Sequence, residues 1–102
     1  MAKKPPTAEE KRHMERVSQM PCLVCPTRPV EIHHVTGQAT RIGRLTRRHD
    51  RVTPLCDRHH RISAPGGHLE SVEALSHRGF FKRFWIDLEK VAEFLWEERK
   101  VE

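Results

Sequence analysis

The sequence contains no tyrosine, two tryptophans and four phenylalanines, and only 36% of its residues are hydrophobic. No apolar run approaches the ~18 residues that a membrane-spanning helix needs, and the basic start lacks the apolar stretch of a signal peptide. We therefore expect a cytoplasmic protein with no membrane contact. With 102 residues, one domain with a small core is expected, and such a core is often reinforced by a metal or disulfides.

The three cysteines cannot all pair within the chain, which argues against a disulfide framework and for a reducing compartment. Two residues separate Cys22 from Cys25, and two separate Cys56 from His59. Zinc favours four tetrahedral thiolate or imidazole ligands. The spacing predicts a structural Zn²⁺ bound by Cys22, Cys25, Cys56 and His59, whose binding would add to the free energy of folding. The alternative is buried free cysteines that act as small hydrophobic residues.

Positive charge gathers around the cysteines and histidines. The formal net charge is +5. Residues 41–61 contain seven arginines and only two acids, whereas residues 87–102 contain six acids. This distribution predicts a polyanionic partner such as DNA, and a solvated basic surface is the alternative. The arginines expected to contact nucleic acid are Arg41, Arg44, Arg47, Arg48, Arg51 and Arg61.

The first half of the chain predicts one helix and two strands. Residues 1–6 are expected to be a disordered basic tail. Thr7 and Glu10 then have the spacing of a capping box, which predicts a helix over about 8–19. Strands are expected near 30–35 and 51–55, with a polar loop between them, and Pro54 indicates a sheet edge or a strand end.

Helices dominate the second half. One should begin near Cys56 or Asp57 and end at Pro65-Gly66-Gly67. Ser71 and Asp87 are expected to begin two more, and apolar residues recur at helical spacing after Asp87, as on a helix that faces a core. The aromatic residues of the stretch before it are also interpreted as core: Phe80, Phe81, Phe84 and Trp85.

The histidines occur in two adjacent pairs, His33-His34 and His59-His60. Adjacent residues on a helix point about 100° apart. If His59 turns toward zinc, His60 therefore points elsewhere and can serve a second site. His33 and His34, at a strand end, should diverge in the same way, so that one holds a metal while the other handles a proton.

Together, Cys-x2-Cys, Val-Glu-Ile-His-His and Thr-Pro-Leu-Cys-x2-His-His resemble the HNH (His-Me finger) endonucleases, and more narrowly the phage and prophage recombination-enhancement nucleases called Ref-like. The resemblance covers about 21–68, and more loosely 71–96. It implies an α+β fold, a zinc-stabilised ββα-metal finger with flanking helices at about 8–19 and 71–100, in one domain spanning 7–102. It also implies hydrolysis of DNA in a bacterial or phage-infected cell.

The resemblance also implies roles for individual residues. His34 matches the general base, for which an imidazole is suited at neutral pH. His33 and His60 match ligands of the catalytic divalent ion, Mg²⁺ or Mn²⁺, with Ni²⁺ and Zn²⁺ as alternatives. Asp50 is expected to support the base, as the middle residue of the family motif does.

In the family that the sequence resembles, a further metal ligand often lies four residues after the helical ligand that matches His60. Here that position is Ala64. His68 is the expected replacement, with His77 and then water as alternatives.

Two other functions remain open from the sequence. A zinc-stabilised nucleic-acid-binding module without catalysis needs the same cysteines and arginines, and the missing ligand at Ala64 favours it. The surplus histidines favour the enzyme. A third possibility is a phage accessory protein whose acidic C-terminal helix docks a recombination or packaging partner, such as a recombinase or another DNA-processing protein. The sequence does not decide between single- and double-stranded DNA, because a basic loop contacts phosphates.

Overall fold

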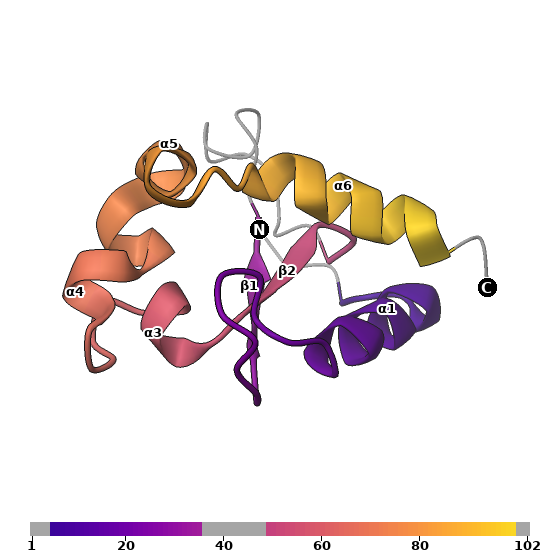
Figure 1. The fold of residues 1–102 in the computed structure, drawn as a ribbon. Helices are drawn as coiled ribbons and strands as arrows, with labels where there is room; N and C mark the ends of the chain where they lie inside the picture. The colour runs from indigo at the N-terminus through magenta and orange to yellow at the C-terminus, as the bar shows by residue number, and fades with distance from the viewer. Residues whose placement is uncertain (1–4, 36–48, 100–102) are drawn as a thin grey trace.

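A computed structural model describes residues 5–35 and 49–99 of the chain. These residues form a small α+β structure around a two-stranded antiparallel sheet. Figure 1 shows the sheet in the middle, with two helices on the right, α1 (Ala8–Ser18) and α6 (Leu88–Glu98). The short helices α3 (Asp57–His60) and α4 (Gly67–Glu70) lie on the left with α5 (Val72–Phe84). Most of the expected tail (1–4), the polar loop (36–48) and position 100 lie outside the described residues.

The sheet pairs β1 (Glu31–His34) with β2 (Val52–Leu55), close to the two predicted strands. His33 lies opposite Thr53 and His34 opposite Val52. All four residues of β2 are buried, including Pro54. A proline is tolerated there because each strand of a two-stranded sheet has an unpaired edge.

Helix α1 begins where the capping box predicts. The Thr7 hydroxyl accepts from the Glu10 backbone N–H at 3.1 Å, and the Glu10 carboxylate accepts from the Thr7 N–H at 2.8 Å. These two bonds satisfy donors that the first turn of a helix otherwise leaves unpaired. Val17 and His13 form the buried face of the helix.

The hydrophobic core consists of two clusters. One joins Val17, Val52 and Leu95, so it holds α1 and α6 against β2. The other contains two of the cysteines and links β2 to α5 and α6: Cys22, Val35, Leu55, Cys56, Val72, Phe80, Leu88 and Ala92. The predicted apolar face of the last helix is thus confirmed by Leu88, Ala92 and Leu95. None of the helices in the described part of the chain is long and apolar enough to cross a membrane.

Helix α3 is shorter than predicted. It ends at His60, and Arg61 already has extended backbone angles of −112° and 134°. The reason is the close approach of Gly67: an added Cβ would lie 1.9 Å from the Arg61 carbonyl oxygen. Ala64 therefore lies in a turn and not one helical turn beyond His60.

The aromatic residues of α5 divide between core and surface, so the expectation that all four are core is wrong for two of them. Phe80 is fully buried and its ring lies 4.8 Å from that of Phe84. Phe81 and Trp85 are 42% and 80% exposed. The division follows helix geometry, because residues four apart share a face and these two pairs occupy neighbouring faces.

Gly67→Ala should lower the free energy of unfolding by about 1–3 kcal/mol, because the new methyl group would overlap backbone atoms that cannot rotate away. Urea unfolding monitored by circular dichroism measures the change. Gly79→Ala is the matched control: its Cβ would meet side-chain atoms and no backbone, Leu75 Cβ at 3.2 Å and Ser76 Oγ at 3.9 Å. A change in stability at Gly67 no larger than at Gly79 would contradict the close packing of this turn.

Candidate functional site

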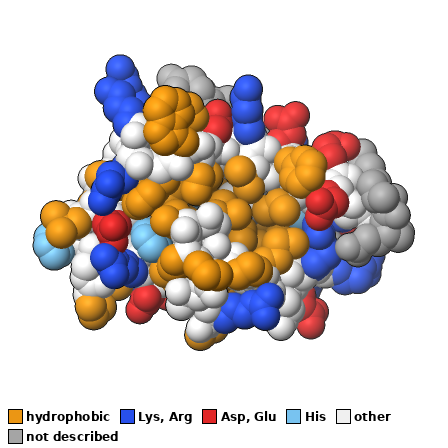
Figure 2. Space-filling view, viewed as in Figure 1, with side chains coloured by type: hydrophobic (Ala, Val, Ile, Leu, Met, Phe, Trp, Pro, Cys, Tyr) orange, Lys and Arg blue, Asp and Glu red, His pale blue; other side chains and the backbone are white. Residues whose placement is uncertain are grey.

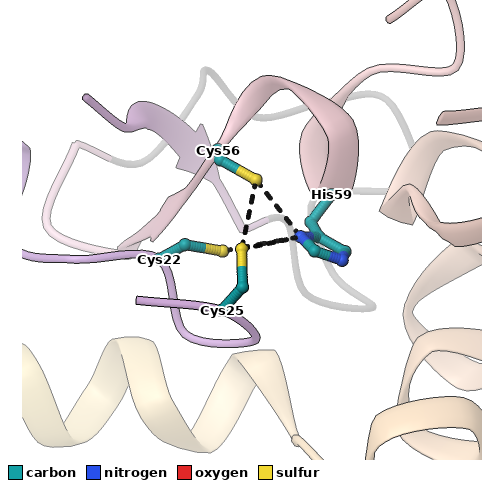
Figure 3. Close-up of side chains that lie close together, drawn as sticks. All are labelled: Cys22, Cys25, Cys56 and His59. Carbon is teal, nitrogen blue, oxygen red and sulfur yellow. Dashed lines mark hydrogen bonds between the residues drawn. The ribbon is translucent and has the colours of Figure 1, made fainter. Parts of the chain in front are cut away.

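Four side chains converge between the N-terminal part of the chain, the end of β2 and α3 (Figure 3). The ligand atoms of Cys22, Cys25, Cys56 and His59 all lie within 4.8 Å of one another. The Nδ1 atom of His59 is 3.7 Å from Cys22 Sγ, 3.6 Å from Cys25 Sγ and 3.2 Å from Cys56 Sγ. The four residues predicted to bind zinc are therefore brought together.

Local backbone structure fixes these side chains. In the segment that carries Cys22 and Cys25, the Cys22 N–H donates to the Thr27 carbonyl at 3.1 Å, and the Val24 N–H donates to Cys22 Sγ at 3.4 Å. The Leu23 N–H donates to the Pro54 carbonyl at 3.2 Å, which ties the segment to β2. Cys56 directly follows β2, so both halves of the site are anchored on one strand.

The donor set fits a zinc ion. Ligands on a tetrahedral zinc with bonds of about 2.0–2.3 Å lie about 3.4–3.8 Å apart, and the Cys25 and Cys56 sulfurs are 3.7 Å apart. Burial raises the pKa of the Cys56 thiol to about 11 without a metal. A cation is what turns such a buried thiol into a thiolate ligand. A zinc ion held by these four protein ligands would have no open position, which fits a structural role.

Glu70 supports the other side of the His59 ring. Its carboxylate forms an ion pair with Arg58, lies 3.6 Å from Arg83 Nη2, and is 3.8 Å from His59 Nε2. A carboxylate behind a metal-bound imidazole helps to fix its orientation and raises its basicity. Glu70 could not be predicted from the sequence, because nothing in its spacing relates it to His59.

A second group of histidines lies on the other side of α3. His33 Nε2 is 3.0 Å from His77 Nε2, and the rings of His33 and His60 have centroids 5.2 Å apart. His60 Nδ1 is 2.7 Å from Glu31 Oε1, which leaves Nε2 as the ring nitrogen available to a ligand. As expected, His59 and His60 serve different clusters. The group of Glu31, His33, His60 and His77 is called the histidine cluster below.

Burial lowers the pKa of His33 most, and together with the neighbouring His60, His77 and His34 it brings the pKa to about 3. His33 is therefore neutral at physiological pH and offers a lone pair. Neutral imidazole is the form that binds a metal ion.

His34 diverges from His33, as expected for adjacent strand residues. Its Nε2 atom is 3.2 Å from His49 Nδ1, and the two rings meet edge to face. Asp50, the expected support of the base, pairs with Arg51 at 3.2 Å. The contact of His34 with His49, the residue just before Asp50, was not predicted from the sequence.

The other predicted site residues fall into three groups. His68 is exposed in α4, and among the described residues no contact joins it to His33 or His60. Arg61 is more than half exposed and its Nε atom donates to Glu31 Oε1 at 2.8 Å. Four arginines predicted to contact nucleic acid lie outside the described residues: Arg41, Arg44, Arg47 and Arg48.

Glu31 is a residue that the sequence could have revealed. Alternate residues of a strand share a face, so Glu31 and His33 point the same way. A carboxylate that orients a histidine is a common companion of a metal ligand.

The described residues thus combine four ligand residues that could hold a metal ion with a cluster of imidazoles beside a small sheet. A model of one protein family, described as recombination enhancement, RecA-dependent nuclease, matches residues 6–95. The chain belongs to this family of nucleases. No curated protein and no solved structure matches it.

Replacing Cys56 by serine should abolish stoichiometric zinc binding and lower the melting temperature, because the remaining ligands no longer complete the tetrahedron. Bound zinc is measured by elemental analysis after exhaustive dialysis, and melting by circular dichroism. The control is His68→Ala, which should keep one zinc per chain. A Cys56→Ser protein that retains the full zinc content would contradict the assignment of this site.

Proposed function

We propose that the chain is a metal-dependent HNH endonuclease that hydrolyses phosphodiester bonds in DNA. The observation that carries this proposal is that the histidine cluster lies beside His34 and next to a separate group of four potential zinc ligands. This group, called the zinc-type site below, consists of Cys22, Cys25, Cys56 and His59. A structural protein needs only the four zinc ligands. Membership in a nuclease family supports the same conclusion.

The order of β1, β2 and α3 supports a ββα-metal finger as the catalytic core of one domain spanning residues 7–102. In this proposal the zinc-type site holds β2, α3 and the Cys22–Cys25 segment together. Such an anchor matters here because α3 is a single helical turn, too short to be stable without tertiary contacts. The zinc-type site would therefore fix the position of His60.

The ligands proposed for the catalytic ion are His33, His60 and His77. Ligands at right angles on an ion with bonds of about 2.1 Å lie about 3.0 Å apart, and the Nε2 atoms of His33 and His77 are separated by 3.0 Å. His77 is therefore preferred over His68, which is exposed in α4. When bound, the ion supplies Lewis-acid polarisation of the phosphate and stabilises the leaving oxygen. Mg²⁺ and Mn²⁺ are the first candidates, and an all-imidazole set also suits Ni²⁺ or Zn²⁺.

His34 is proposed to take the proton from the attacking water. The water oxygen forms a bond to phosphorus and the bond to the 3′ oxygen breaks, which leaves a 5′-phosphate and a 3′-hydroxyl. His49 is proposed as a positioning residue that holds the His34 ring through its 3.2 Å contact. Asp50, which pairs with Arg51, stays the residue predicted to support the base.

The arginines complete the proposal by holding the DNA backbone. Arg61 shares Glu31 with His60, so a phosphate bound by Arg61 would lie near the histidine cluster. The missing ligand at Ala64 had favoured a binding module without catalysis. Against that argument, the Nε2 atom of His77, from a different helix, lies 3.0 Å from that of His33, which makes His77 a candidate for the further ligand.

The family description makes the proposed nuclease dependent on RecA. We therefore expect the substrate to be DNA engaged in recombination, in a bacterial or phage-infected cell, with the recombinase as partner. Cleavage tests should include RecA-coated DNA beside naked DNA.

His34→Ala should reduce the cleavage rate of DNA by about 10²–10⁴-fold, because a general base contributes a factor of this size. Nicking of supercoiled plasmid is measured with Mg²⁺ and with Mn²⁺, with and without RecA-coated single strands. The variant must retain its zinc and its melting temperature. Equal cutting by wild type and variant would remove His34 from the mechanism, and no cutting by the wild type under any condition would favour the binding module.

His77→Ala should raise the concentration of divalent ion needed for half-maximal cleavage by at least about tenfold, because one ligand of the ion is lost. The matched control is His68→Ala, for which we expect no change. Titration of cleavage rate against Mn²⁺ separates the two variants. The opposite result, with a shift for His68 alone, would restore His68 as the further ligand.

A further inference from the structure

Helix α5 carries an exposed aromatic surface that the catalytic proposal does not use. Trp85 is 80% exposed and Phe81 42% exposed, and their ring centroids lie 5.7 Å apart. An exposed patch of large aromatic side chains can mark an interaction site.

The backbone holds Trp85 in this exposed position. Trp85 ends α5 with φ of 62° and ψ of 29°, the left-handed conformation that usually falls to glycine, and its N–H donates to the Phe81 carbonyl at 2.7 Å. A bulky residue rarely adopts this conformation. The ring is thus presented at a fixed place next to Phe81.

The aromatic pair belongs to the same helix face as His77. After a non-helical residue at Ser76, positions 77, 81 and 85 follow at intervals of four, which places them along one side of α5. At about 1.5 Å per residue, Trp85 lies about 12 Å along the helix axis from His77. The surface therefore leads directly away from the histidine cluster.

The charge of this surface is positive. Between residues 74 and 85 the helix carries Arg78, Lys82 and Arg83 and no acid. Arg78 and Lys82 are exposed, whereas Arg83 is engaged with Glu70 and with the Phe84 ring. Figure 2 shows hydrophobic and cationic side chains side by side over the α5 end of the molecule.

We propose that Phe81 and Trp85 form a stacking platform for unpaired bases of the DNA strand that enters the histidine cluster, with Arg78 and Lys82 on its phosphates. Aromatic faces accept any base, and neighbouring cations follow the backbone, which is how single strands are bound without sequence preference. Paired bases in a duplex do not offer their faces. The proposal rests on the proposed function and names its substrate as DNA with unpaired bases beside the cut.

The test measures binding of labelled oligothymidylate and of a duplex of the same length by fluorescence anisotropy, with zinc-loaded protein and no added divalent ion. Trp85→Ala should weaken binding of the single strand by about 5- to 100-fold and of the duplex by less than about twofold. Trp85→Phe should restore most of the lost affinity, because a stacking ring returns. Lys82→Ala should weaken both complexes by similar factors, because phosphates are common to both.

Phe94→Ala is the matched control. Phe94 is 62% exposed on α6, and it lies beside Lys90 and the acids Glu93 and Glu97. We expect it to leave binding of both DNAs unchanged.

Unchanged single-strand affinity in Trp85→Ala, or an equal loss for the duplex, would overturn the proposal. So would loss of self-association in this variant at constant DNA affinity, seen by sedimentation velocity, since the surface would then be a contact between copies. Binding is measured without cleavage, so the two proposals fail separately. If the protein prefers single strands through Trp85 but cuts no DNA, the proposed stacking platform stands and the proposed nuclease activity is wrong.

Discussion

The described structure depends on the convergence of three thiols and one imidazole around a position suited to zinc. The hydrophobic clusters on either side of the sheet are small, and Cys22 and Cys56 belong to one of them. Metal binding can contribute as much free energy as the whole net stability of an ordinary small domain. Removing the metal would therefore loosen the sheet, α3 and the core together.

The same anchor links folding to chemistry. Cys56 and His59 belong to the zinc-type site, and His60 is the very next residue. Its ring reaches Glu31 on β1, and β1 also carries His33 and His34. Catalytic groups must be held to within a fraction of an ångström to be effective, and in the proposed nuclease this rigidity would come from a metal site one peptide bond away. In this way a chain with few aromatic residues can position several imidazoles.

Local signals in the sequence predicted much of the fold. The capping box of Thr7 and Glu10, the two strands and the helix-starting residues Ser71 and Asp87 were predictable because each depends on neighbours within a few positions. The zinc ligands were predictable because their chemistry is specific and their spacing is short. The early end of α3 was not, because it depends on the contact between Gly67 and the Arg61 carbonyl.

The histidine cluster was only partly predictable. The divergence of His33 from His34, and of His59 from His60, follows from backbone geometry. The contact between His33 and His77 joins residues 44 positions apart and depends on how α5 packs. Similarly, the exposed face of α5 was not predictable, because it depends on which aromatic residues pack into the core, and these are Phe80 and Phe84. Membership in the nuclease family gave the context but no residue assignments.

The adjacency of His59 and His60 has a consequence for how this sequence can change over time. Substitutions around the pair alter one cluster at a time. Counted from Cys56, one inserted residue would put the His59 ring in the place of the His60 ring, and one deleted residue would do the reverse. Either change would leave one of the two clusters without its member of the pair. Relatives of this chain should therefore vary less in the number of residues between Cys56 and His59 than in their identity.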